Sequence, residues 1–463
     1  MNKDTETNNG LRLTPFDNGF QPLLEYQRCY VGFSGGLDST VLLHAFVRFV
    51  RQQSLANPPA IIAIHVNHQL HNNSAEWQQH CRQICGVLDV TFVSEQVTVQ
   101  SDGKGFESAA RTQRYAAFKR QLQGGTAEGK IALLLAHHAN DQAETLLMRL
   151  FRGAGTAGAA SIPTQRKLGN TDLVRPLLDF TREQLFAYAQ HHQLQFIDDP
   201  SNRDDRFDRN FIRNQVLPLV EQRWSGAVNA LNRYVGIAAG DAALLDELAG
   251  IDIQSVEQHA SPYGASLAIT DLLRLSPQRR INLVRYWLSV HKLLRPTQTR
   301  ISEIEQLLHC QAAQSNTNPT VTLGDYQLSI YRDSLYLFNA AYLARVTQVM
   351  QFGVTCSGID KIEVADFGRL SAQGTVLVPE GLAPGQYRLA SRRDGVQYRY
   401  RGMTRSLKKW FNEQGIPPWF RDCYPIIYSG DQLAAIPGHI VCDDFRSVEG
   451  WQPVWEWLTP DKV

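Results

Sequence analysis

The feature that most constrains this sequence is a glycine-rich turn between an apolar strand and an apolar helix. The turn spans residues 34–39 and reads Ser-Gly-Gly-Leu-Asp-Ser, while residues 29–33 predict a buried strand and residues 41–47 predict a helix. Glycines let the backbone approach a ligand closely, and successive N–H groups at the positive end of a helix attract anions. The turn therefore predicts phosphate binding.

Three further apolar segments predict strands of the same sheet. They alternate with two segments, 74–88 and 106–118, whose apolar residues recur at helical spacing. The predicted strands cover residues 60–66, 89–93 and 131–136. Near-continuous apolar strands that alternate with helices are typical of a parallel sheet covered on both faces. We therefore predict a doubly wound α/β domain.

Polar residues follow three of these strands at the point where each strand ends. They occupy residues 34–39, 65–71 and 137–144. Ligands of open parallel sheets bind at the carboxyl ends of the strands. The convergence predicts that the functional site lies at this edge of the sheet.

Two carboxylates at adjacent strand ends, Asp38 and Asp141, predict a magnesium site. Magnesium prefers oxygen ligands and commonly takes one or two carboxylates together with substrate phosphates. The alternative role of Asp141 is to cap the helix that follows it. The histidines His65, His68 and His71 suggest zinc, but no cysteine or carboxylate completes a ligand set. We expect these histidines to line a nucleotide site or to be structural.

The composition is that of a globular protein. The 463 residues predict about two to four domains, and the apolar fraction of 43% and charged fraction of 20% are ordinary. The net charge of +1 predicts no partner, and seven scattered cysteines indicate reduced thiols. No apolar run reaches the roughly 20 residues of a membrane helix. The polar residues 1–24 lack a signal-peptide core, so we expect a disordered tail, a cytoplasmic protein and no membrane partner.

Changes in patterning along the chain predict the domain boundaries. Long amphipathic stretches follow the α/β domain, and a hairpin is expected at residues 326–338. The predicted parts are an α/β domain at 25–221, a helical domain at 222–345, a connector at 346–379 and a small β-rich domain at 380–463.

Two arginine-rich segments suggest nucleic-acid contacts. Residues 392–409 hold seven basic residues against one Asp, with Tyr398 and Tyr400 between them. Basic side chains neutralise phosphates and aromatic rings stack on exposed bases. The candidate contacts are Arg399, Arg401, Arg405, Lys408 and Lys409. Residues 198–213 mix five Asp with Arg203, Arg206, Arg209 and Arg213, so a self-neutralising solvated segment is the alternative there.

The turn at residues 34–39 lacks a Walker A ending and the dinucleotide Gly-x-Gly-x-x-Gly pattern. It resembles the loop of the PP-loop family, the N-type ATP pyrophosphatases, which cleave ATP between the α and β phosphates. Other segments are similar to those of tRNA(Ile)-lysidine synthases. They are residues 66–70, 107–115, 137–145, 152–155, 174–177, 199–202 and 209–213. The chain departs from the usual pattern at His71, Asn140 and Asp394, and the matches are dense over residues 28–220.

The resemblance implies ATP-dependent joining of free L-lysine to the wobble cytidine of tRNA(Ile) with a CAU anticodon, with Mg²⁺. It implies that Asp38 and Asp141 bind the metal and that Arg111 or Arg114 acts on the α-phosphate. It implies that the helical and C-terminal domains bind tRNA, together with the arginines of residues 203–213. The implied ATP contacts are Ser34, Gly35, Gly36, Leu37, Asp38, Ser39, and His137 or His138. No obligate protein partner is evident.

Three other functions share parts of this pattern. A PP-loop tRNA thiolase would need a catalytic cysteine pair or a Cys-x-x-Cys motif, and the sequence has no such motif. An amidotransferase-type synthetase would need a glutaminase domain with a nucleophilic cysteine near the start of the sequence, and that feature is absent. A non-catalytic RNA-binding protein would retain the loop as a relic, but the complete Ser34–Ser39 loop and Asp141 argue against that alternative.

Overall fold

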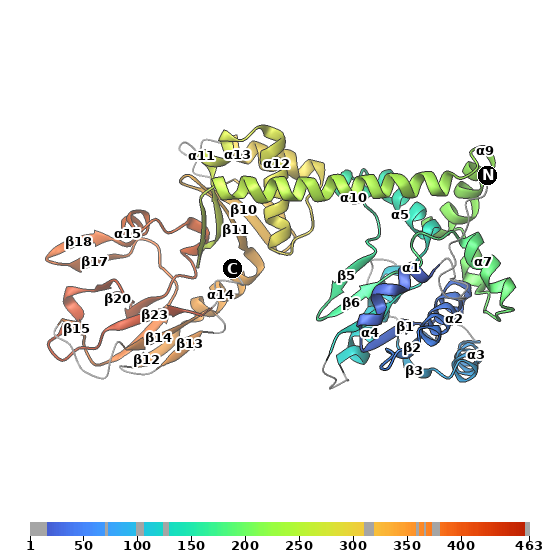
Figure 1. The fold of residues 1–463 in the computed structure, drawn as a ribbon. Coiled ribbons are helices and arrows are strands. Elements are labelled where there is room, and N and C mark those ends of the chain that lie inside the picture. The colour runs from blue at the N-terminus through green and yellow to red at the C-terminus, as the bar shows by residue number, and fades with distance from the viewer. Residues whose placement is uncertain are drawn as a thin grey trace. The chain divides into compact units, whose positions relative to one another are not determined.

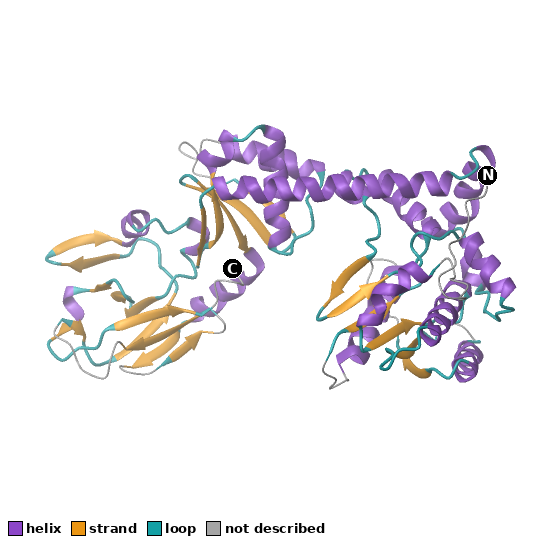
Figure 2. Cartoon of the chain, viewed as in Figure 1, coloured by secondary structure: helices purple, strands orange, loops and turns teal. Residues whose placement is uncertain are grey.

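The computed structural model describes residues 16–69, 73–98, 106–123, 129–309, 319–357, 361–364, 367–372 and 380–458 (Figure 1). The chain divides into two compact units, Met1–Ala243 and Leu244–Val463, with the boundary inside helix α10 (Ala227–Asp252). Helices and strands alternate in the first unit, whereas strands dominate the C-terminal part of the second (Figure 2).

A six-stranded sheet forms the centre of the first unit. Its order is β3-β2-β1-β4-β6-β5, and every neighbouring pair is parallel except β5 with β6. The strands are β1 (Arg28–Gly32), β2 (Ala60–Asn67), β3 (Thr91–Gln96), β4 (Ile131–Leu134), β5 (Gln165–Leu168) and β6 (Thr171–Val174). This sheet confirms the predicted doubly wound α/β fold.

Helices cover both faces of this sheet. The helices of the first unit are α1 (Asp17–Phe20), α2 (Leu37–Gln52), α3 (Ser74–Val87), α4 (Phe106–Gln123), α5 (Ala139–Phe151), α6 (Thr156–Ala159), α7 (Arg182–His191), α8 (Asp208–Phe211) and α9 (Leu217–Arg223), with the short helical segments η1 (Gln21–Glu25), η2 (Pro200–Arg203) and η3 (Ile212–Val216). Residues of η3 and α9 pack with α5. Val31 of β1 packs with residues of α2, α3 and α7, whereas its neighbour Tyr30 packs with Phe118 of α4. Successive strand residues point to opposite faces, so both faces need an apolar cover.

Residues 16–25 belong to the core of the first unit. Phe16, Phe20 and Leu23 are at most 2% exposed, and the Phe16 ring meets Phe180 edge-on at 4.6 Å. The prediction of a disordered tail is therefore wrong for residues 16–24, because these apolar anchors are spaced for a short helical turn among polar neighbours. Residues 1–15 lie outside the described part of the chain.

The second unit begins with an antiparallel sheet that the sequence patterning largely missed. The predicted hairpin is confirmed as β10 (Tyr326–Tyr331) and β11 (Ser334–Asn339). Three more strands join it, β7 (Gln258–Ser261), β8 (Gly264–Ala268) and β9 (Thr320–Leu323), in the order β7-β8-β11-β10-β9. The prediction of a helical domain with a single hairpin therefore missed three strands, because these strands are too short to show a period of two.

Three helices accompany this sheet, namely α11 (Ile269–Arg274), α12 (Pro277–Val290) and α13 (Gln298–His309). Leu283 and Trp287 of α12 and Ile304 of α13 share a buried cluster with sheet residues such as Leu328. The amphipathic stretch at residues 267–290 is divided at Ser276-Pro277, where Ser276 caps α12.

The remainder of the second unit is β-rich, as predicted. Its elements are α14 (Ala340–Phe352), β12 (Val354–Ser357), β13 (Ile362–Val364), β14 (Gly368–Ala372), β15 (Gly381–Leu382), β16 (Gln386–Ala390), β17 (Gln397–Tyr400), β18 (Met403–Ser406), α15 (Leu407–Glu413), β19 (Ile426–Ser429), β20 (Gln432–Ile436), β21 (Ile440–Val441), β22 (Arg446–Ser447) and β23 (Pro453–Trp457). Met350, Cys356 and Leu370 lie in its buried cluster. The predicted connector, 346–379, therefore contributes buried residues to this core.

The two parts of the second unit share an aromatic contact. The Trp419 ring stacks on Phe338 with centroids 4.7 Å apart, and its indole N–H donates to the Tyr263 carbonyl at 3.2 Å. Among the helices that are described, none has the length and apolarity to cross a bilayer.

Candidate active site

The loop at residues 34–39 connects β1 to α2 in a conformation that requires glycine at position 35. Gly35 has a φ of +84°, and a Cβ there would lie 2.7 Å from Cys81 Sγ and from Ile197 Cδ1. The Ile197 N–H donates to the Gly35 carbonyl at 2.9 Å, which holds the loop against the segment after α7. A larger residue at position 35 would face both backbone strain and collision.

The two serines of this loop support each other. Their hydroxyl oxygens lie 3.0 Å apart, and the Ser34 N–H donates to Ser39 Oγ at 3.2 Å. Gly36 precedes α2 and offers no capping side chain to the first turn of the helix. The first-turn N–H groups and the helix dipole therefore present positive potential to a ligand.

A cavity of about 510 Å³ opens beside this loop, within the roughly 300–1,000 Å³ typical of small-molecule sites. Its lining comes from the loop, the carboxyl ends of β2 and β4, helix α4 and the segment after α7. The lining residues used below are Ser34, Gly36, Leu37, Asp38, Ser39, His68, Arg111, Arg114, Tyr115, His137, Asp198, Asp199, Asn202 and Arg213. The strand ends that the sequence predicts to converge thus line one cavity.

The two predicted metal ligands meet through a buried histidine. His138, 1% exposed, places Nε2 3.5 Å from Asp38 Oδ2 and 3.6 Å from Asp141 Oδ2. Burial lowers the pKa of His138, but the carboxylates of Asp141 and Asp38 outweigh it, so the pKa lies above its usual value. Asp38 Oδ1 is buried and has no hydrogen-bond partner among the described residues. This oxygen fits an added cation.

Asp141 is already surrounded by donors. Its Oδ1 accepts from Arg209 at 2.7 Å and Arg213 at 3.1 Å, and its Oδ2 accepts from the His138 N–H at 3.0 Å. Burial alone would raise the pKa of Asp141, but His138 and Arg209 hold it well below its usual range. Asp38 is therefore the better placed of the two for Mg²⁺, because both oxygens of Asp141 already accept hydrogen bonds. A metal contact by Asp141 stays a prediction. Asp141 also forms the predicted helix cap, in a capping box with His138.

Arg209 and Arg213 share a second carboxylate, Glu144 of α5. Glu144 is fully buried and accepts from Arg209 Nε at 2.8 Å and from Arg213 Nε at 2.6 Å. We call Asp141, Glu144, Arg209 and Arg213 the buried charge network. A tRNA contact by Arg209 or Arg213 stays a prediction, and the network shows that both guanidinium groups already hold their segment to α5.

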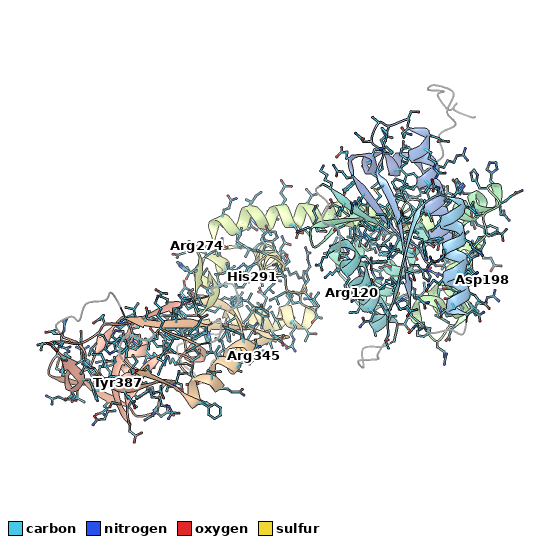
Figure 3. All side chains as sticks on the ribbon, turned by 90° about the horizontal axis from the view of Figure 1, so that it is seen from below. Arg120, Asp198, Arg274, His291, Arg345 and Tyr387 are labelled. Atoms are coloured by element: carbon cyan, nitrogen blue, oxygen red, sulfur yellow. The ribbon has the colours of Figure 1, made fainter. Side chains whose placement is uncertain are left out.

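The other two arginines of residues 198–213 are exposed. Arg203 pairs with Asp198 at 2.5 Å, and Arg206 pairs with Asp204 at 2.6 Å (Asp198 is labelled in Figure 3). Surface pairs of this kind exchange readily with other charges. A contact of Arg203 or Arg206 with tRNA stays a prediction.

The two adjacent histidines before α5 lie in different surroundings. His138 is buried, whereas His137 lines the cavity and accepts at Nδ1 from Arg175 Nε at 3.2 Å. Burial, together with the charges of Arg175 and Arg209, lowers the pKa of His137 to about 3. His137 is therefore neutral at pH 7 and is the better placed of the two for a ligand contact.

Both arginines predicted to act on the α-phosphate, Arg111 and Arg114, line the cavity. Arg111 Nη2 donates to the Tyr115 hydroxyl at 3.4 Å. Arg114 lies near His68, and the pKa of that histidine is lowered first by burial and then by the charge of Arg114. His65 donates from Nδ1 to the Phe33 carbonyl at 3.0 Å, which is a structural role. His71 lies outside the described residues. Among those that are described, no group of three or more His, Cys, Asp or Glu side chains is placed to hold a metal ion.

The basic segment of the second unit forms the hairpin β17–β18 and helix α15. The guanidinium carbons of Arg401 and Arg405 lie 5.3 and 5.7 Å from the Tyr400 ring centroid. Arg399 lies 4.0 Å from Asp444, and Lys409 lies 3.9 Å from Glu413. These pairs are weak, so the exposed cations of this surface remain open to a ligand.

The cysteines disfavour thiolase chemistry. The six in the described part of the chain are free and buried, and they are Cys29, Cys81, Cys85, Cys356, Cys423 and Cys442. Burial raises the pKa of Cys81 and of Cys85 to about 12, so neither is a thiolate near neutrality.

Sequence reasoning missed three residues that contact the cavity lining: Glu144 contacts Arg213, Arg175 contacts His137, and Arg166 lies over the ring of Tyr115. The segments 137–145 and 174–177 contained Glu144 and Arg175 but suggested no role for them. Arg166 lies in β5, an edge strand whose exposed pattern carried no signal.

Comparisons with known proteins agree with this geometry. The profile described as "PP-loop domain" matches residues 12–220, "TilS substrate binding domain" matches 267–336, and "TilS substrate C-terminal domain" matches 387–457. A solved U34-tRNA thiolase from Methanococcus maripaludis aligns at 14% identity and a TM-score of 0.41, over 48% of this chain and 77% of that one, which is too low to bear on activity.

Curated relatives match along nearly the whole chain. The tRNA(Ile)-lysidine synthase of Serratia proteamaculans is 37% identical and covers 92% of this chain and 94% of its own. Those of Alkalilimnicola ehrlichii and Yersinia pseudotuberculosis are 38% and 36% identical, covering 93% and 96% of this chain and 94% and 96% of their own. The chain therefore belongs to the tRNA(Ile)-lysidine synthase family.

Proposed function

We propose that this chain uses ATP to join free lysine to C2 of the wobble cytidine in tRNA(Ile) with a CAU anticodon, releasing AMP and pyrophosphate. Membership of the synthase family supports the RNA substrate, and the PP-loop domain supports the use of ATP. The observation that carries the proposal is the single cavity into which the PP-loop, Asp38 and Arg111 all face.

The reaction needs activation of the base, because an amine does not displace oxygen from C2 of cytosine unaided. In the first step O2 of the cytidine attacks the α-phosphate, an O–P bond forms and pyrophosphate leaves. In the second step an amine of lysine attacks C2, the C2–O2 bond breaks, and AMP departs with that oxygen while the amine gives up a proton. The target base must first leave its stack, as anticodon loops allow.

The residues of the loop have roles that follow from their chemistry. The first-turn N–H groups of α2 and the hydroxyls of Ser34 and Ser39 would hold the β and γ phosphates. Arg111 would neutralise charge that develops on the α-phosphate, with Arg114 as the other candidate. Mg²⁺ held by Asp38 and by the phosphates would screen the charge of the triphosphate.

The buried charge network would act on this site indirectly. His138 connects Asp38 to Asp141, and Arg213 both lines the cavity and joins the network. We infer that the network fixes the carboxylate of Asp38 in position. The tRNA would be held in addition by Arg399, Arg401, Arg405, Lys408 and Lys409 of the second unit.

The test is incorporation of labelled lysine into unmodified tRNA(Ile) with a CAU anticodon, in the presence of ATP and Mg²⁺. Initiator tRNA, which shares that anticodon, and a reaction without lysine are the controls. We expect lysine transfer to tRNA(Ile) alone, with one AMP released for each lysine. Cleavage of ATP without lysine transfer would contradict the proposed ligation.

A further inference from the structure

Three arginines from different elements surround Tyr115. The guanidinium carbons of Arg111 on α4 and Arg166 on β5 each lie 5.2 Å from the Tyr115 ring centroid. Arg175, which follows β6, interacts with the Tyr115 phenol and is 2% exposed. We call Arg111, Arg166 and Arg175 with Tyr115 the Tyr115 cluster.

The positive charge of this cluster is not neutralised by any Asp or Glu among the described residues. Arg111 donates to Tyr115, and Arg175 donates to His137 and to the Pro163 carbonyl at 2.6 Å. By contrast Arg120, on the same helix as Arg111, pairs with Glu95 at 2.5 Å. Like charges held together without an acid create the potential that an anion needs.

The environment of Arg175 agrees with this description. Burial lowers the pKa of Arg175, the Tyr115 phenol opposes that shift, and the charges of Arg166 and Arg111 lower it further. Arg175 is also fixed in place, because its Nη1 and Nε donate to groups of the protein. Arg175 is thus a fixed, buried charge of the cluster, whereas Arg111 and Arg166 are exposed and accessible to a ligand.

The cluster leads from the cavity to the surface. Arg111 and Tyr115 line the cavity, whereas Arg166 is outside the lining, on the exposed edge strand β5. A nucleoside triphosphate would end inside the cavity, but a polynucleotide whose base enters it must continue beyond the mouth. Each phosphodiester of that strand carries one negative charge, and a guanidinium group is suited to bind it.

We propose that the Tyr115 cluster binds a backbone phosphate of the RNA beside the nucleotide that enters the cavity, with Arg166 making the outer contact. This inference rests on the proposed function and adds a phosphate site separate from the PP-loop. Arg111 then lies between the two phosphate sites. Tyr115 acts as a positioning residue, because its ring contacts the guanidinium groups of both Arg111 and Arg166.

The first test replaces Arg166, which is exposed and therefore dispensable for folding, by glutamine. With intact tRNA(Ile) the Kd should rise about tenfold, as expected for one charged hydrogen bond. The slope of log K against log salt should fall by about 1, because one phosphate contact is lost. The KM for ATP should not change. Arg120→Gln is the matched control (Arg120 is labelled in Figure 3) and should bind tRNA like the wild type.

The second test removes the charge from the RNA instead. A tRNA(Ile) assembled with a neutral methylphosphonate on either side of the wobble nucleotide should bind wild type about tenfold more weakly at one of the two positions. The same substitution should cost Arg166→Gln clearly less than it costs the wild type, because the outer contact is already absent in that variant. A loss of affinity from the RNA change that simply added, at both methylphosphonate positions, to the loss from Arg166→Gln would overturn the proposal. So would a raised KM for ATP with unchanged tRNA affinity, which would assign the cluster to ATP.

The two proposals fail in different ways. If the proposed function is wrong, the wild type does not transfer lysine, whatever the affinity of its variants for tRNA. If only the Tyr115 cluster is misassigned, the wild type transfers lysine and Arg166→Gln binds tRNA as tightly as Arg120→Gln does.

Discussion

Two arginine-rich segments that look alike in the sequence have different surroundings in the fold. In the first unit, Arg209 and Arg213 point inward to Asp141 and Glu144, with contacts of 2.6–3.1 Å. In the second unit, the arginines of hairpin β17–β18 rest on the ring of Tyr400. The difference teaches that arginines close together in the sequence can serve buried ion pairs in one segment and an exposed surface in another.

The difference also separates two tasks. The inward arginines brace the carboxylates next to the PP-loop, so changes there should alter chemistry and stability. The outward cations lie on a surface with weak ion pairs, so changes there should alter affinity for RNA. The comparison fails if changes to the inward arginines alter only RNA affinity, or if changes to the outward cations alter catalysis or stability.

The largest effect is expected from Asp38→Ala. Lysine transfer should fall about 100-fold to 1,000-fold, because the carboxylate that would hold Mg²⁺ beside the phosphates is lost. Affinity for tRNA(Ile) should not change. Steady-state kinetics and filter binding measure the two quantities, with exposed Glu76→Gln as the control. Full activity in Asp38→Ala would exclude Asp38 as a metal ligand.

The next effect concerns the buried charge network. Glu144→Gln leaves two guanidinium groups short of one charge, so the free energy of unfolding should fall by about 3 kcal/mol. The matched control, Asp198→Asn, breaks an exposed pair and should cost less than about 1 kcal/mol. Urea denaturation of both variants measures the difference. Equal losses would show that the network is no more important for stability than a surface pair.

A smaller effect is expected on the outward surface. Reversing both charges in Lys408→Glu/Lys409→Glu should weaken tRNA binding about 30-fold and reduce its salt dependence. The KM for ATP should stay unchanged, because the cavity belongs to the first unit. Lys119→Glu, a charge reversal at an exposed position of α4, serves as the control. Unchanged tRNA affinity in the double variant would remove these lysines from the RNA surface.

The smallest effect is a pH dependence of stability in the first unit. Burial, then His192 and Arg48, lower the pKa of His44 from 6.5 to about 4. The unfolded chain therefore takes up the proton first, and this contribution to stability is complete above pH 6.5 and is lost as the pH falls toward 4. Because His44 is only partly buried, the loss should be about 1 kcal/mol.

Denaturation of wild type and His44→Asn at pH 7 and pH 5 checks this prediction. The variant should lose less stability than the wild type between the two values. A pH dependence that is identical in wild type and variant would show that His44 is not responsible.

Much of the catalytic unit was predictable because its signals are local. The PP-loop glycine and serines act within six residues, and apolar strands with helical neighbours determine a parallel sheet whatever lies elsewhere. The β-rich character of the C-terminal part followed from the same kind of patterning. The short strands β7, β8 and β9 were not predicted, because four or five residues are too few to show an alternation of apolar and polar side chains.

The sequence by itself therefore determined the fold class, the phosphate loop and the edge of the sheet where the site forms. Only the tertiary structure decided which charges meet. Arg209 contacts Glu144, 65 residues away in the sequence, and Arg213 contacts Asp141, 72 residues away. The Tyr115 cluster likewise brings together residues of three separate elements. Ion pairing depends on distance and burial, and neither is encoded in the composition of a single segment.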